Sequence, residues 1–99
     1  MEIHNKISVP ALLELTAEEC TELAHAALKL ARYLRGENPT PADSDMLAMK
    51  LHEELADVLV CSNVLVEADM LIPAIIKQYE KNKIERWAER LKEKSKKGE

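Results

Sequence analysis

The chain has 99 residues, of which 46% are hydrophobic, and it carries a net charge of −4 at pH 7. This length fits a single domain over residues 1–99, and the hydrophobic content is that of a folded protein. The acidic balance argues against a nucleic-acid-binding protein, and the lack of a membrane-length apolar run, a secretory leader or a Cys-x-x-Cys motif predicts a cytoplasmic protein that contacts no membrane.

The first predicted helix spans about residues 10–35. Ser8 is suited to cap its start, Pro10 to its first turn, and Gly36 to its end. A polar loop that contains two prolines follows over residues 36–41. No segment of useful length alternates between apolar and polar residues, so we expect no strands.

The second predicted helix spans about residues 43–67 and begins at Asp43 or Ser44, which are both good capping residues. The third spans about residues 69–92 with Pro73 in its first turn, and the charged tail 93–99 is expected to fray. Long helices joined by short loops predict an all-α antiparallel helical bundle of three long helices per chain. Because the second helix is apolar around much of its circumference, we expect oligomerisation to complete the bundle, as a homodimer or homotetramer.

Acidic residues interrupt the apolar stripes of the first two helices. At 100° per residue, one stripe consists of Leu12, Leu23, Ala27, Leu30 and Leu34, and the other of Leu47, Leu51, Leu55, Val58 and Leu65. Glu19 falls inside the first stripe with Glu22 at its edge, and Glu54 and Asp57 repeat this arrangement on the second. Buried carboxylates need a proton or a cation, and a hard divalent ion, Mg²⁺ or alternatively Mn²⁺, suits four of them. Replacing Glu54 by Gln should then abolish Mg²⁺ binding and relieve repulsion in the metal-free protein.

Other interpretations of these residues stay open. Glu19 could be the third-position acid of a capping box that begins at Thr16, and a single Glu-x-x-Glu pair is more often a solvated helix face. Glu22 and His25 form one Glu-x-x-His string, whereas a carboxylate-bridged di-iron protein needs two. A non-catalytic helical protein-interaction module would keep the same fold. The repetition of the acidic pair on a second helix favours the metal site over these alternatives.

The acidic pairs and their neighbours resemble the MazG-like nucleotide pyrophosphohydrolases of the all-α NTP pyrophosphatase superfamily, whose signature is Glu-x-x-Glu followed by Glu-x-x-Asp. The similar segments are residues 18–29, 35–40 and 53–57. The resemblance implies an enzyme that hydrolyses a nucleoside triphosphate to the monophosphate and pyrophosphate, with a role in clearing the nucleotide pool. It implies that Glu19, Glu22, Glu54 and Asp57 hold Mg²⁺. Glu18, Glu19 and Glu53 are then the candidates for the general base.

The third helix matches the family less well. Many relatives carry a Lys…Asn…Arg pattern that contacts phosphate, and the candidates here are Lys77, Asn82, Lys83 and Arg86. Their spacing departs from the commonest form of the pattern. A basic third helix is equally explained as an ordinary solvated face, so these four residues are expectations that follow from the resemblance.

Overall fold

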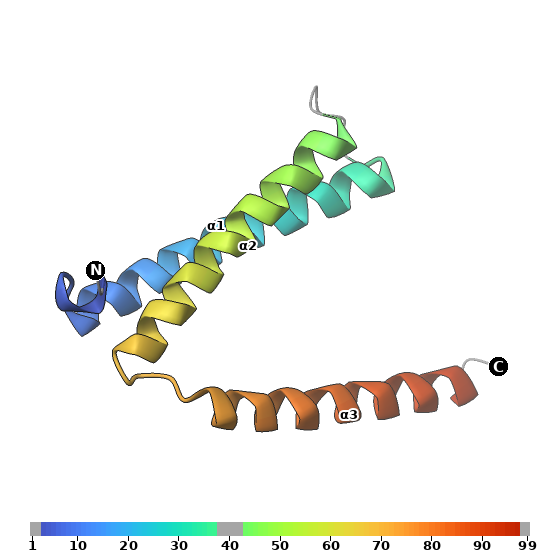
Figure 1. Cartoon of the computed structure of the whole chain (residues 1–99). Coiled ribbons are helices and arrows are strands. Elements are labelled where there is room, and N and C mark those ends of the chain that lie inside the picture. Colours follow the sequence, from blue (N-terminus) through green and yellow to red (C-terminus); the bar gives the residue numbers. More distant parts are fainter. Residues whose placement is uncertain (1–2, 38–42, 98–99) are drawn as a thin grey trace.

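The computed structural model describes residues 3–37 and 43–97, and within these ranges the chain is helical and contains no strand (Figure 1). A 3₁₀ turn, η1 (Ile3–Asn5), precedes the three helices α1 (Val9–Arg35), α2 (Ser44–Glu67) and α3 (Pro73–Lys97). The all-α fold class is therefore as predicted, and the ends of α1 and α2 agree with the expected ones. Of the expected loop and tail, residues 38–41 and 98–99 lie outside the described residues.

Local hydrogen bonds account for both ends of α1. The backbone N–H of Ala11 donates to Ser8 Oγ at 3.3 Å, and Pro10 lies in the first turn, where a missing N–H costs nothing. At the other end Gly36 adopts a left-handed conformation with φ 70°. The backbone N–H groups of Gly36 and Glu37 donate to the carbonyls of Tyr33 and Arg32, which ends the helix in a Schellman motif.

Capping interactions also define both ends of α2. The end of α2 shows that the third helix starts later than expected. Asp43 caps α2, because its Oδ1 accepts from the backbone N–H of Met46 at 2.8 Å. Asp69 does not cap α3; it adopts a left-handed conformation with φ 59° at the end of α2, where the N–H of Met70 donates to the carbonyl of Leu65. The third helix accordingly begins at Pro73 rather than near residue 69, and its last helical residue is Lys97.

Helices α1 and α2 pack against each other as an antiparallel pair (Figure 1). One series of buried and half-buried residues on each of these two helices, which we call the seam, recurs at alternating intervals of three and four. On α1 they are Leu12, Thr16, Glu19, Leu23, Ala26, Leu30 and Tyr33; on α2 they are Ser44, Leu47, Leu51, Glu54, Val58, Cys61 and Leu65. This 3.5-residue period is that of a coiled coil. Residues Leu12, Val64 and Leu65 form a hydrophobic core cluster, against which Ile7 and Leu71 pack.

Helix α3 diverges from this pair instead of packing along it (Figure 1). The Cα radius of gyration is 17.7 Å, whereas a compact domain of this length has about 13 Å. The accessible surface is 8056 Å², whereas a compact monomer of this mass exposes about 5,700 Å². The expected antiparallel packing therefore holds for α1 and α2 but not for α3. Among the described helices, none is both long and apolar enough to cross a membrane.

Candidate metal centre

Three carboxylates meet between the middles of α1 and α2. Glu54 lies in the seam with only 6% of its surface exposed, and Glu19 lies half-buried in the seam of the facing helix. Asp57, one turn after Glu54, is exposed at the edge. One carboxylate oxygen from each of these three residues lies within 4.8 Å of the others. Two helices whose seams contain an acid, with Asp57 at the edge, thus bring three carboxyl groups together.

The donor set fits a hard divalent ion. All three donors are carboxylate oxygens, which Mg²⁺ and Mn²⁺ prefer over the nitrogen and sulfur ligands typical of zinc. Octahedral Mg²⁺ holds oxygens at about 2.1 Å, so that opposite ligands lie about 4.2 Å apart. The observed spread of up to 4.8 Å is close to that separation.

The pKa of Glu19 is raised by loss of hydration and, beyond that, by the neighbouring acids. Loss of hydration raises the pKa of the Glu19 carboxyl above its ordinary value, and the charge of Asp57 and a hydrogen bond with Asp57 raise it further. The charges of Glu54 and Glu22 act in the same direction. A bound cation would reverse these effects, because it favours the ionised carboxylates.

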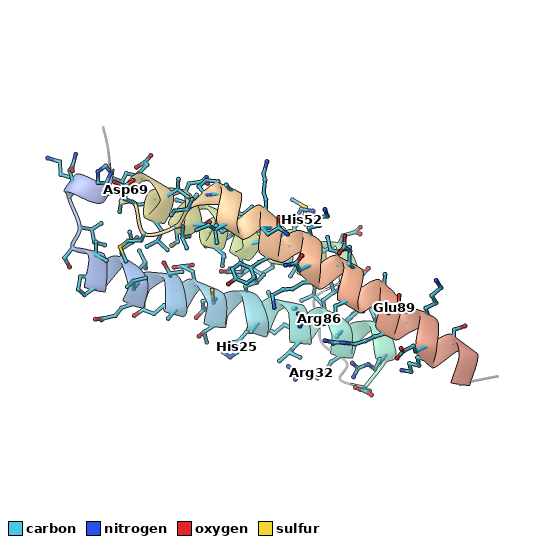
Figure 2. All side chains as sticks on the ribbon, turned by 90° about the horizontal axis from the view of Figure 1, so that it is seen from below. His25, Arg32, His52, Asp69, Arg86 and Glu89 are labelled. Carbon is cyan, nitrogen blue, oxygen red and sulfur yellow. The ribbon has the colours of Figure 1, made fainter. Side chains whose placement is uncertain are left out.

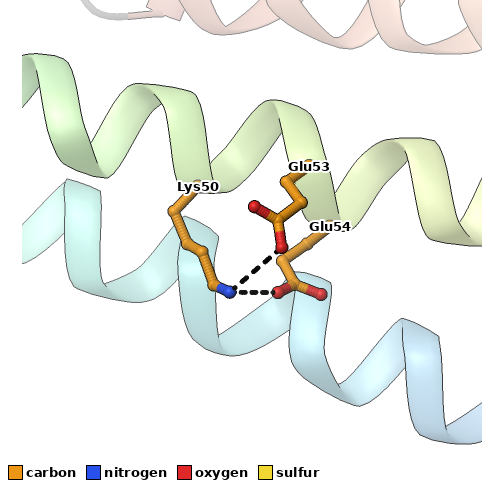
Figure 3. A network of polar contacts seen from close by, with 3 residues as sticks. All are labelled: Lys50, Glu53 and Glu54. Atoms are coloured by element: carbon orange, nitrogen blue, oxygen red, sulfur yellow. Dashed lines mark hydrogen bonds and ion pairs between the residues drawn. The ribbon is translucent and has the colours of Figure 1, made fainter.

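A lysine accompanies the buried acid of α2. Lys50 Nζ lies 2.9 Å from Glu54 Oε1 and 3.4 Å from Glu53 Oε1 (Figure 3). The hydrogen bond with Glu54 raises the pKa of the Lys50 ammonium, as do the charges of Glu53 and Glu54. Lys50 is not part of the acidic motif, but the spacing of four residues between Lys50 and Glu54 is a sequence signal for this ion pair.

The remaining motif acids are not among the three clustered donors. Glu22 is exposed and is not one of the three clustered donors, although it lines a pocket of about 180 Å³ together with His25, Ala26, Lys29, Leu47, Lys50 and Glu54. Glu18 and Glu53 are both exposed. Of the three candidate bases, the geometry therefore ties Glu19 directly to the cluster and Glu53 through Lys50.

Two of the competing interpretations can be compared with these positions. Thr16 lies inside α1, where its hydroxyl donates to the Leu12 carbonyl at 2.7 Å, so it does not begin a capping box with Glu19. His25 is not one of the three clustered donors, and it leaves α1 on the side away from α3 (Figure 2). The arrangement of the cluster is thus one of carboxylates alone rather than that of a Glu-x-x-His site.

The candidate phosphate-binding residues lie on α3, apart from the acidic cluster. Lys77, Asn82, Lys83 and Arg86 are all exposed, and the Asn82 side chain accepts a hydrogen bond from Gln78 Nε2 at 3.2 Å. Lys83 and Arg86 line a shallow pocket of about 270 Å³ with Trp87 and Arg90. All four lining residues come from α3, so within the described chain this basic pocket and the cluster are separate features.

Comparison with known proteins finds no match among protein families, curated proteins or solved structures.

Proposed function

We propose that the chain is a Mg²⁺-dependent nucleoside triphosphate pyrophosphohydrolase of the MazG-like kind, with Mn²⁺ as an alternative ion. The observation that carries the proposal is the convergence of Glu19, Glu54 and Asp57, with one oxygen from each within 4.8 Å of the others and with Glu54 buried. A protein that only needed solubility would keep these acids apart on its surface, because clustering them costs free energy.

The proposed division of labour follows from the positions of the acids. Glu19, Glu54 and Asp57 hold the ion, and Glu22 joins them by a change of side-chain rotamer. The ion, when bound, neutralises charge on the phosphate oxygens and makes a water more acidic. Glu53, which neighbours the cluster through Lys50, or Glu19 accepts a proton from the attacking water, which adds to the α-phosphorus as pyrophosphate leaves.

The α1/α2 pair offers Lys29 and Lys50 beside the cluster, and the triphosphate carries more negative charge than these two residues balance. We propose that α3 of a second copy covers the pair in a homodimer or homotetramer, and that it brings Lys83 and Arg86, with Lys77 and Asn82, toward the triphosphate. The surface in excess of a compact monomer is roughly 2,000 Å² or more, and a stable interface needs about 800 Å² from each partner. Opposite charges on α3 and on the acidic cluster favour the same pairing.

The direct test is incubation of the full chain with a panel of ribo- and deoxyribonucleoside triphosphates and Mg²⁺. Pyrophosphate and the monophosphate should appear in equal amounts, and a chelator should stop the reaction. Replacing Asp57 by Asn should lower the rate by about 100-fold or more, whereas replacing Glu14, an exposed acid on α1, by Gln should not. Orthophosphate as the first product would overturn the proposal.

A non-catalytic helical interaction module is the second candidate. It is favoured by the apolar side chains that α3 exposes, among them Tyr79, Ile84 and Trp87, the last with 65% of its surface exposed. Such a module would be folded and oligomeric but would hydrolyse no triphosphate at any Mg²⁺ concentration. The nucleotide panel therefore separates the two candidates.

A further inference from the structure

The buried acid of the candidate metal centre already has a positive partner. Glu54 exposes only 8% of its side chain, and the Lys50 ammonium lies 2.9 Å from its Oε1 (Figure 3). The Lys50 side chain itself is 56% exposed. The ammonium therefore reaches a buried carboxylate from the solvent side, at the end of a flexible aliphatic chain.

This ion pair supplies the positive charge that the buried Glu54 carboxylate requires when no metal ion is bound. A buried carboxylate without a partner is costly, and the nearby acids Glu19 and Asp57 add to the cost because they are negative as well. A divalent ion on Glu54 would meet the Lys50 ammonium on the same carboxylate. Two cations so close repel each other, so binding of the ion works against the contact between the ammonium and Glu54.

We propose that Lys50 is a built-in competitor of the metal ion: its ammonium occupies Glu54 when the ion is absent, and it lowers the affinity of the site for the ion. This inference rests on the proposed function, because it assumes that the cluster binds a divalent cation. It assigns Lys50 a regulatory role at the site. A protein with this device keeps its buried acid paired in both states, at the expense of metal affinity.

A different role for Lys50 would have the opposite consequence. If Lys50 held the Glu54 carboxylate in the orientation that binds the ion, its removal would weaken metal binding. Removal of a competitor strengthens it. The direction of the change therefore distinguishes the two roles, without any measurement of catalysis.

The experiment is a titration of the chelator-treated full chain with Mn²⁺, in which free Mn²⁺ is measured by electron paramagnetic resonance. Lys50→Met should bind Mn²⁺ about tenfold more tightly than the parent, which corresponds to about 1.4 kcal/mol. Lys50→Arg keeps the charge and should bind about as weakly as the parent. Lys29→Met removes the same charge from the same pocket without removing the ion pair with Glu54, and it should change the affinity by less than about threefold.

Each outcome decides the matter. The inference is overturned if Lys50→Met binds Mn²⁺ no more tightly than the parent. It is also overturned if Lys29→Met gains as much Mn²⁺ affinity as Lys50→Met. In both cases the proposed function stands, provided that the parent binds the ion. No binding by the parent or any variant overturns both proposals. Circular dichroism monitors folding, and Lys50→Gln, whose amide can still donate to Glu54, replaces Lys50→Met if that variant does not fold; it too should bind Mn²⁺ more tightly.

Discussion

Glu54 and Glu19 occupy seam positions on facing helices, but their carboxylates have different neighbours. Lys50 pairs with Glu54 at 2.9 Å, whereas the neighbours that act on Glu19 are Asp57, Glu54 and Glu22, all negative. The acidic pattern alone predicts that replacing Glu54 by Gln relieves repulsion. Because Lys50 compensates the charge of Glu54, Glu19 is the acid whose repulsion by its neighbours has no positive partner to offset it.

Replacing Glu19 by Gln should therefore stabilise the metal-free protein at pH 7. Because the pKa of Glu19 is raised in the folded chain, the folded state binds its proton more readily than the unfolded chain. Stability is consequently lost as the pH rises from the ordinary value of 4.5 through the raised pKa, and the variant escapes this loss. Urea unfolding in the presence of a chelator should show the variant to be more stable at pH 7, with a difference that shrinks toward pH 4.

Glu14→Gln is the matched control for this measurement, because Glu14 is an exposed acid on the same helix. It should leave the pH dependence of unfolding as in the parent. A Glu19→Gln protein that is less stable than the parent at pH 7 would contradict the described crowding. In Mg²⁺ the order should reverse, since Glu19→Gln forfeits a ligand to the ion.

At the level of single residues, the sequence predicts the three clustered acids but not all of their surroundings. A helical wheel is enough to place Glu19 and Glu54 in apolar stripes and Asp57 beside them. It cannot say which acids meet, and Glu22 lies outside the cluster of three donors. Nor does an acidic motif draw attention to Lys50, whose importance follows from its distance to a buried carboxylate.

At the level of helices, the buried positions follow a period that a single wheel misses. A step of 100° predicts that Ala27 and Leu34 face the core, yet Ala26 is buried and Tyr33 half-buried in their place, while Leu34 is 69% exposed. The seam repeats every 3.5 residues rather than 3.6, so a straight-helix wheel drifts by one position over several turns. The pattern identifies each helix correctly but misplaces the distant end of its buried face.

Gly36 at the end of α1 provides a test of the capping assignment. Its φ of 70° lies in the left-handed region, and a Cβ at this position would meet nothing within 4 Å. Replacement by Ala should therefore lower the free energy of unfolding by about 1 kcal/mol through backbone strain alone. Gly36→Asn should lower it less, since Asn tolerates this conformation, and urea unfolding would measure both. Equal stability of Gly36→Ala and the parent would contradict the assignment.

Asp69 offers the reverse substitution at the end of α2. It adopts φ 59°, a conformation that costs an aspartate more than a glycine. Asp69→Gly should raise the free energy of unfolding by about 0.5 kcal/mol, measured in the same urea series. A loss of stability would indicate that the Asp69 side chain makes a contribution at this turn beyond its backbone conformation.

At the level of the whole molecule, the path of α3 is what the sequence could not predict. An amphipathic stripe indicates that a helix buries one face, but it does not say whether the partner is the same chain or another. The α1/α2 pair buries most of its seam internally, whereas Tyr79, Ile84, Trp87 and Leu91 of α3 are all exposed in the single chain. Their exposure favours a second copy as the partner.

Sedimentation velocity at micromolar concentration should accordingly detect a dimer or tetramer. Trp87→Glu should shift the protein toward the monomer, because it introduces a charge into the proposed interface. Lys92→Glu, a charge change at another exposed position of α3, should leave the assembly intact. A parent protein that sediments as a single monomeric species would rule out the proposed covering of the acidic cluster by α3.

Hydrolysis in water enriched in ¹⁸O tests most directly the claim that this carboxylate cluster directs water to the α-phosphorus of a nucleoside triphosphate. With Mg²⁺ and the best substrate of the panel, ³¹P nuclear magnetic resonance reports which product carries the label. We predict ¹⁸O in the nucleoside monophosphate and unlabelled pyrophosphate. Label confined to the pyrophosphate, or orthophosphate as the first product, would contradict the account.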